Sequence, residues 1–512
     1  MKLHNPLNER RSGILLHPTS LPGPWQSGDF SHNAYRFVEF LAAAGQSIWQ
    51  MMPLGVTHDD GSPYQSLSTH AGNPLLISLD WLVERGWLES TVWEHVEHSK
   101  KWRLDTLERA CKNALDTLDK STSDDFDRFV RGQNYWLDDY ANFVVLMKLE
   151  QGAGWFDWPA GLKSNDKDAV ESALADHQEL LIIRKFEQYI FFCQWRELRR
   201  FAHERGVYLF GDLPIFVSGN SADVWAHREN FTVNEDGCST VVAGVPPDAF
   251  SEDGQLWGNP LYDWQALQRD DFSWWIDRLR THFSLFDMIR IDHFRGLEAC
   301  WEIPASADSA KTGQWVKAPG SELLEKIAKK FTDMPLVAED LGIITAEVDQ
   351  LRKQFSLPGM KVLQFAFDED PDNHHLPHNH STDTVVYTGT HDNDTTASWF
   401  YTADDQTRQR VCGYLECGDH DMPWPLVRSA MMSVAQTAIF PMQDVLGLGT
   451  GHRMNLPGTT EGNWQWRFDW SQVDTGLAER LRELTGRYSR LPDGEPIREL
   501  GNIWPAHDRR KA

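Results

Sequence analysis

The chain has no long hydrophobic run. None of its 512 residues falls in a stretch approaching the roughly 18 apolar residues of a membrane-spanning helix. The first segment, MKLHNPLNERRSGILLHP, also lacks the apolar region of a signal peptide. Cysteine is scarce, with six scattered residues and no CxxC pair, which is typical of a reduced protein. We therefore expect a cytoplasmic protein that has no membrane partner.

Basic side chains are in deficit. The chain carries 49 Lys and Arg against 75 Asp and Glu, which gives a formal net charge of −26. Nucleic acids and anionic membranes are bound mainly through Lys and Arg, so this balance argues against both as partners. The first predicted strand is not followed by GxGxxG, and no glycine-rich phosphate loop occurs, so we expect no nucleotide cofactor.

Eight short apolar runs recur along the chain, and most of them follow a segment with helical periodicity. They are residues 12–18, 46–55, 207–214, 286–294, 335–342, 361–368, 384–394 and 436–444. Continuous apolar strands that alternate with helices indicate a parallel sheet buried on both faces. Eight such strands predict a (β/α)₈ TIM barrel. A doubly wound sheet is the alternative, and the missing GxGxxG disfavours it.

The spacing of the runs predicts how the chain divides into domains. Residues 78–200, between the second and third runs, are helical in pattern and predict a helical insertion subdomain. The barrel would then comprise residues 1–77 and 201–512. Residues 212–286 are rich in Gly, Pro and Asn, which predicts a long functional loop with little regular structure. The last predicted helix, near residues 476–490, leaves no room for a C-terminal β-sandwich.

Ionisable residues stand at the ends of four runs, where a barrel places its chemistry. They are Asp212, Arg290 with Asp292, Glu339 with Asp340, and His391 with Asp392. Strand alternation places Arg290 and Asp292 on one side, where the arginine would keep the carboxylate ionised. Burial and nearby carboxylates would raise the pKa of Glu339, as a general acid requires. Taken singly, these residues are equally consistent with rim ion pairs, helix caps or turns.

Taken together, the carboxylates match retaining glycoside chemistry, which needs two carboxyl groups about 5–5.5 Å apart. A metal site is the main alternative, because DNHHLPHNH at residues 372–380 contains four histidines. Their spacing follows no helical or strand ligand pattern, and their polar neighbours predict an exposed loop, so we expect no metal. His17, His293 and His391 lie at strand ends, where we expect contacts with substrate hydroxyls.

Four strand-end segments resemble the signatures of the 4-α-glucanotransferases, or amylomaltases, a family related to the α-amylases. The segments are GDLPIFV (211–217), RIDHFRG (290–296), VAEDLG (337–342) and GTHDND (389–394). Residues 61–77, 244–262 and 454–467 match further stretches of the family. The resemblance therefore extends over nearly the whole chain, from Gly13 to about Arg467.

The resemblance implies transfer of α-1,4-glucan segments to the 4-hydroxyl of an acceptor glucan or glucose. Donors would be malto-oligosaccharides, glycogen or starch-derived glucans, and no cofactor would be needed. Asp292 would be the nucleophile of a double displacement, Glu339 the acid/base, and Asp392 a stabiliser of the distorted sugar. The substrate-binding residues it implies are Tyr64, Asp212, Phe250, Trp257, Arg290 and His391.

Two other functions are compatible with such a barrel. One is a hydrolytic α-amylase-type glucosidase, which the aromatic loop at 244–264 and the lack of a C-terminal sandwich disfavour. The other is a non-catalytic glucan-binding protein, and binding alone does not require the trio Asp292, Glu339 and Asp392. The sequence does not decide the oligomeric state, for which a monomer or a weak dimer is the expectation.

Overall fold

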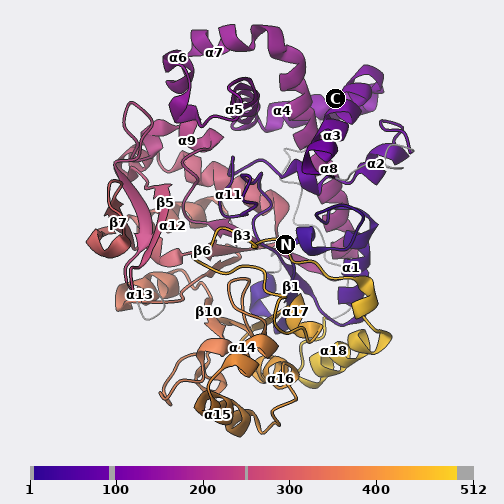
Figure 1. Ribbon diagram of the computed structural model, residues 1–512, viewed down its shortest axis with the longest axis vertical. Coiled ribbons are helices and arrows are strands. Elements are labelled where there is room, and N and C mark those ends of the chain that lie inside the picture. Colours follow the sequence, from indigo (N-terminus) through magenta and orange to yellow (C-terminus); the bar gives the residue numbers. More distant parts are fainter. Residues whose placement is uncertain (1–4, 91–98, 248–251, 332, 493–512) are drawn as a thin grey trace.

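A computed structural model describes residues 5–90, 99–247, 252–331 and 333–492. At its centre lies an eight-stranded parallel sheet, ordered β10-β11-β12-β1-β2-β3-β6-β9 (Figure 1). Its strands are β1 (Arg11–Leu15), β2 (Ile48–Gln50), β3 (Tyr208–Pro214), β6 (Met288–Asp292), β9 (Leu336–Ala338), β10 (Gly359–Val362), β11 (Thr384–Tyr387) and β12 (Thr437–Pro441). Ala338 N–H donates to the Pro358 carbonyl over 2.9 Å, which joins the two ends of the sheet. The predicted barrel is confirmed, and each strand falls within or at the edge of a predicted run.

The strands are mainly apolar because both of their faces are buried, and the charged residues Asp212, Arg290 and Asp292 lie toward their carboxyl ends. Side chains from all eight strands form one cluster that fills the barrel, and Phe210, Met288 and Tyr387 are among its members. Alternate residues, such as Leu209 and Ile289, point outward and join the larger core beneath the helices. This two-sided burial explains why the runs are continuous rather than alternating in hydrophobicity.

Helices surround the barrel, and others form the irregular connections on its rim. Outside the segment between β2 and β3 they are α1 (His32–Ala43), α9 (Ala222–Ala226), α10 (Trp264–Arg269), α11 (Ser273–Leu285), α12 (Gly320–Lys330), α13 (Ala346–Gln354), α14 (Thr396–Thr402), α15 (Asp405–Leu415), α16 (Trp424–Met432), α17 (Met442–Val445) and α18 (Thr475–Arg487). Helix α12 shows the usual cause of such packing. Its buried residues Leu323, Leu324 and Ile327 repeat at helical spacing, and its lysines face outward.

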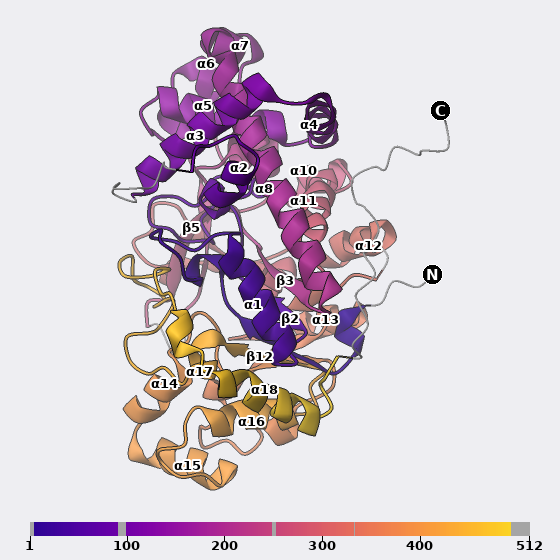
Figure 2. The same cartoon turned by 90° about the vertical axis from the view of Figure 1, so that its right-hand side faces the viewer.

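The segment between β2 and β3 contains the helices that Figure 1 places together at the top of the molecule. They are α2 (Leu79–Glu84), α3 (Lys100–Thr117), α4 (Lys120–Gly132), α5 (Leu137–Leu149), α6 (Ala160–Lys163), α7 (Lys167–Leu174) and α8 (Gln178–Glu204). Helix α8 runs from this group down along the barrel (Figure 2). Residue 200, the predicted boundary, lies inside this continuous helix, which packs against α3 and α5 at one end and leads into β3 at the other.

The region 212–286 is not the irregular loop that its composition predicted. It contains two strands of a four-stranded antiparallel sheet, ordered β5-β4-β7-β8. These strands are β4 (Val241–Val245), β5 (Gln255–Pro260), β7 (Ala299–Pro304) and β8 (Gln314–Lys317). Backbone pairing with β7, which comes from beyond β6, orders β4. The prediction was wrong because this partner is distant in sequence and the strands are short and interrupted by glycine and proline.

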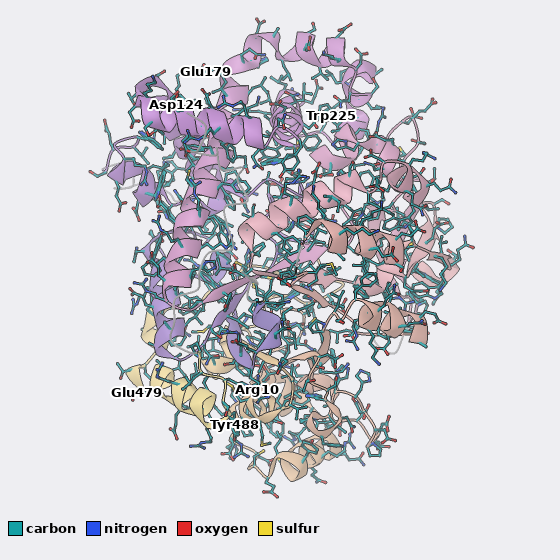
Figure 3. The ribbon with its side chains drawn as sticks, turned by 180° about the vertical axis from the view of Figure 1, so that it is seen from behind. Arg10, Asp124, Glu179, Trp225, Glu479 and Tyr488 are labelled. Carbon is teal, nitrogen blue, oxygen red and sulfur yellow. The ribbon has the colours of Figure 1, made fainter. Side chains whose placement is uncertain are left out.

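The two ends of the described chain meet beside β1 and β12. The Arg10 guanidinium donates to the Tyr488 carbonyl over 3.2 Å, and the two residues lie next to each other in Figure 3. Arg490 is fully buried and donates to the carbonyls of Arg11, Met431, Ser433, Ala435 and Gln436.

No helix among the described residues is long and apolar enough to cross a membrane.

Candidate functional site

The candidate site lies at the carboxyl ends of three neighbouring strands. Asp212 on β3 pairs with Arg290 on β6, and Ile291 on β6 pairs with Ala338, the last residue of β9. Glu339 is the next residue after Ala338 in the chain. Parallel strands end at the same rim, so the register alone places these charged residues together.

Arg290 binds two carboxylates at once. One terminal nitrogen lies 2.6 Å from Asp212 Oδ2, and the other lies 2.7 Å from Asp292 Oδ1. The Tyr64 hydroxyl donates to the same Asp212 oxygen over 2.7 Å. Arg290 and Asp212 are buried, whereas the Asp292 side chain is 28% exposed. Asp292 is therefore the member of this group that a substrate can reach.

The carboxyl group of Asp292 is less acidic than the arginine contact alone suggests. Burial favours its neutral form, Arg290 opposes that effect, and the Asp212 carboxylate adds repulsion. The net result raises its pKa to about 6. The sequence-based expectation of an ionised Asp292 therefore holds only above that pH, because burial and the Asp212 carboxylate outweigh the effect of Arg290.

Two backbone N–H groups hold Glu339. His293 N–H donates to its Oε2 over 2.7 Å and Leu341 N–H to its Oε1 over 2.8 Å. His293 has the left-handed backbone angle φ 52°, which lets its N–H point at the carboxylate. Burial and the charge of Asp292 raise the pKa of Glu339 to about 7, although Arg290 and these N–H groups oppose the shift. Glu339 is thus a carboxylic acid that can hold its proton near neutrality.

Asp392 differs from both carboxyl groups in its acidity. His391 Nε2 lies 3.2 Å from its Oδ2, and the Asn455 side-chain amide donates to its Oδ1 over 2.6 Å. Partial burial favours the neutral acid, but His391 and Asn455 outweigh it and hold the pKa of Asp392 well below its usual range. Burial likewise opposes a charge on His391, yet Asp392 raises the pKa of that imidazole. The Asp392 carboxylate therefore stays ionised, and His391 is the group that balances its charge.

Aromatic rings border the carboxylates. The Tyr64 ring stacks on the His391 ring at 5.1 Å and 17°, and Trp464 approaches both rings. On the other side, Trp257 packs edge-on against His293 at 4.7 Å. Phe250 belongs to residues 248–251 and lies outside the described residues. The described candidates form two contact groups, one that runs from Asp392 through Tyr64 to Asp292 and one of Glu339 with its neighbours. Glu339 interacts electrostatically with Asp292 and Arg290, which links the two groups.

The histidines at 372–380 do not form a metal centre in the described structure. Among the described residues, no group of three or more His, Cys, Asp or Glu is arranged to hold a metal ion. The expectation of an exposed loop is wrong for His375 and His380, which are both buried. His375 Nδ1 accepts from Val362 N–H, and His380 hydrogen-bonds the His375 carbonyl, so these side chains support the end of β10.

Comparison with known proteins assigns the family. A family model described as 4-alpha-glucanotransferase matches residues 16–472. The chain belongs to the 4-alpha-glucanotransferase family. The 4-alpha-glucanotransferase of Thermus thermophilus is 46% identical over 496 residues, which cover 94% of this chain and 99% of that protein. The enzyme of Synechocystis sp. is 44% identical over 498 residues, with the same coverage of 94% and 99%.

A solved structure supports the same assignment. The amylomaltase of Streptococcus agalactiae, in complex with acarbose, matches with a TM-score of 0.91 and 34% identity over 94% of this chain and 100% of that one. The amylomaltase of Corynebacterium glutamicum matches with a TM-score of 0.74 at 18% identity, which is evidence for the fold alone. Membership of the 4-alpha-glucanotransferase family makes the chain a transferase of the glycoside hydrolase type.

Sequence reasoning missed several side chains of the site. Asn455 fixes Asp392, Trp464 packs on Tyr64 and His391, and Arg453 donates to the Asp392 carbonyl. Asn455 and Trp464 lie in the stretch 454–467 that resembles the family, which was the one available signal. Asp340 belongs elsewhere, because its side chain accepts from Met360 N–H and lies beside Arg352 rather than facing the site.

Proposed function

We propose that the chain transfers α-1,4-glucan segments between malto-oligosaccharides by a double displacement at Asp292 and Glu339. The observation that carries the proposal is the difference in environment between these two carboxyl groups. Asp292 is open to substrate and held by a guanidinium, whereas Glu339 is buried and held by backbone N–H groups. One group is suited to attack and the other to carry a proton.

In the first step, an Asp292 oxygen forms a bond to the anomeric carbon of the donor sugar. The glycosidic bond breaks, and its oxygen takes the proton from Glu339. In the second step, the 4-hydroxyl of an acceptor sugar attacks the same carbon and releases Asp292. Glu339, now a carboxylate, accepts the hydroxyl proton. One glycosidic bond replaces another, so no metal, nucleotide or other cofactor is required.

The remaining residues have positioning roles in this proposal. Arg290 orients Asp292, and Asp212 orients Arg290. Asp392 and His391 would bind hydroxyls of the reacting sugar, and the fixed charge of Asp392 would stabilise positive charge that develops on the ring. The Tyr64 ring would stack on the donor sugar. Acarbose, the ligand of the related Streptococcus agalactiae amylomaltase, is the class of molecule we expect to bind here.

Acceptor binding would decide between transfer and hydrolysis. Trp257 lies on the Glu339 side, where the leaving sugar departs and the acceptor enters. Phe250, which lies outside the described residues, is assigned to acceptor binding by the resemblance alone. Aromatic surfaces that hold a sugar and shed water favour the sugar hydroxyl as the attacking group.

We further propose a cytoplasmic monomer or weak dimer that has no nucleic-acid or membrane partner.

Maltotriose provides the direct test. We expect the purified protein to convert it to glucose and a ladder of longer oligosaccharides on a thin-layer plate. Asp292→Asn should abolish the ladder and leave the circular dichroism spectrum unchanged. Glucose and maltose without longer products would mean hydrolysis, and unchanged maltotriose would mean binding alone. A ladder that persists in Asp292→Asn would exclude this residue as the nucleophile.

A further inference from the structure

The loop between β11 and α14 is held at both ends by one buried carboxylate. Thr388 follows β11, and its hydroxyl donates to Asp444 Oδ2 over 2.6 Å. Thr396 begins α14, and it donates its N–H to Asp444 Oδ1 over 2.7 Å and its hydroxyl to Oδ2 over 2.6 Å. All three residues are fully buried. Asp392 lies midway along this loop, four positions from each threonine.

Asp444 connects the loop to the barrel wall. It lies in α17, which follows β12 directly, and β12 pairs with β11. Helices α14 and α17 lie next to each other in Figures 1 and 2. The preceding residue, Gln443, donates its side-chain amide to the His452 carbonyl over 3.3 Å. His452 directly precedes Arg453, whose guanidinium donates to the Asp392 carbonyl. The start of α17 therefore holds both segments that meet at Asp392.

The hydrogen bonds at Asp444 are strong because their acceptor is a buried carboxylate. Burial raises the pKa of Asp444, and the bonds from Thr388 and Thr396 oppose that shift. The largest effects on its charge come from burial, these donors and the Asp394 carboxylate, and no cation is among them. Hydrogen bonds to an ionised acceptor are roughly twice as strong as neutral ones. A carboxylate without a cation is also costly to bury, and proteins keep such costs where geometry serves function.

We propose that Asp444 is a positioning residue of the transfer reaction, which acts by fixing the loop that carries His391 and Asp392. The inference rests on the proposed function, in which Asp392 contacts the reacting sugar. Asp444 is fully buried, so it influences the sugar only through Asp392. The interaction of Asp392 with the sugar strengthens as positive charge develops on the ring. Displacement of the loop should therefore lower kcat more than it changes KM.

Removing the carboxylate tests the proposal. Asp444→Ala deletes three hydrogen bonds of the loop, and a misplacement of about 1 Å can cost about a hundredfold in rate. We expect kcat for maltotriose to fall by about tenfold to a hundredfold, with a change in KM of less than about threefold. Asp444→Asn should recover part of kcat, because its amide oxygen can accept from the Thr396 N–H while its NH₂ donates to both threonine hydroxyls. The proposal would be overturned by a wild-type kcat in Asp444→Ala, or by an Asp444→Asn variant that is no faster than Asp444→Ala.

Asp223→Ala is the matched control for loss of stability. Asp223 is buried on α9 and accepts from the Thr69 N–H and hydroxyl over 2.8 and 2.6 Å, so it holds a threonine in the same manner outside the loop. We expect both alanine variants to unfold at a lower urea concentration than the wild type, and only Asp444→Ala to lose kcat. An equal fall in kcat in the two variants would overturn the positioning role.

Thr388 offers the same test with a smaller change, for the case that Asp444→Ala does not fold. Thr388→Val removes one hydroxyl from the carboxylate, whereas Thr388→Ser keeps it. We expect kcat of Thr388→Val to be about threefold or more below that of Thr388→Ser. Equal kcat values in these two variants would overturn the proposal.

The Asp392→Asn background shows whether Asp444 acts through Asp392. The donor is α-maltosyl fluoride, because fluoride is a good leaving group that does not depend on the proton of Glu339. In this background Asp444→Ala should lower the rate of fluoride release by less than about threefold, because the group that it positions is already lacking. A further loss as large as in the active enzyme would overturn the proposal. Failure of the wild-type enzyme to form a ladder from maltotriose would instead contradict the proposed function, because that result does not depend on Asp444.

Discussion

Arg290 shows how one residue sets the chemistry of several others. Its guanidinium forms ion pairs with both Asp212 and Asp292. The positive charge of Arg290 is therefore shared between the two carboxylates. Burial, with repulsion from Asp212, raises the pKa of Asp292 to about 6 despite Arg290, and burial together with the charge of ionised Asp292 raises that of Glu339 to about 7. The usual values for Asp and Glu are about 3.9 and 4.3. The two groups titrate as a pair around neutrality rather than in acid.

The pH dependence of catalysis follows from this pair. Activity requires ionised Asp292 and protonated Glu339. As pH falls below about 6 the nucleophile gains a proton, and as pH rises above about 7 the acid loses one. We expect a bell-shaped profile of kcat/KM for maltotriose with its maximum between these values, measured from pH 4 to 9. A maximum below pH 5 would contradict the assigned environments.

At the scale of single elements, α8 connects the helical region to the barrel. It has 27 residues and is therefore about 40 Å long at 1.5 Å per residue. Near its C-terminus, Arg199 and His203 contact the fully buried Asp287 at 2.6 and 2.9 Å. Asp287 precedes β6 and also accepts from Leu209 N–H on β3 over 2.7 Å. One carboxylate thus joins a helix and two barrel strands.

Asp287→Asn should destabilise the protein by about 3–5 kcal/mol in urea unfolding, because the Arg199 guanidinium loses its buried anionic partner. Burial opposes the charge on Asp287, but Arg199 and His203 hold its pKa well below its usual range. Its contribution is therefore complete above the usual Asp pKa, and it is lost as pH falls toward the folded value. The difference in free energy of unfolding between Asp287→Asn and wild type should therefore become smaller in acid.

Asp105→Asn is the matched control for that measurement. Asp105 forms an exposed pair with Lys101 at 3.3 Å, and such pairs contribute about 0–1 kcal/mol. If both substitutions lowered the free energy of unfolding by the same amount, Asp287 would not join α8 to the barrel strands in the way that its contacts indicate.

At the scale of the whole molecule, side chains from both ends of the described residues support the pairing of β1 with β12. Arg490 lies after the last helix and donates to carbonyls in β1 and in the segment before β12. Arg490→Met should lower the free energy of unfolding by about 3 kcal/mol or more, because several buried carbonyls lose their donor. Arg482→Met, at an exposed position on α18, is the control. If Arg490→Met and Arg482→Met unfolded at the same urea concentration, the stabilising role of Arg490 would be contradicted.

Much of this architecture could be predicted from the sequence. The eight barrel strands were visible because burial on both faces makes each one continuously apolar, and charges at their ends marked the rim. The strands β4 and β5 were not visible, because β4 is ordered by pairing with distant β7, and β5 pairs in turn with β4. The role of Asn455 was not predicted for a similar reason. Only the folded barrel brings it next to Asp392, 63 positions away in sequence.

The coupling between Asp292 and Glu339 has a consequence for the second half of the reaction. When Asp292 becomes an ester to the sugar, it loses its negative charge, and the repulsion that helps to raise the pKa of Glu339 disappears. Arg290 and the two N–H donors remain, and they favour the carboxylate. The proton affinity of Glu339 should therefore fall once the ester has formed. The residue that enters the cycle as an acid is then ready to act as a base toward the acceptor hydroxyl.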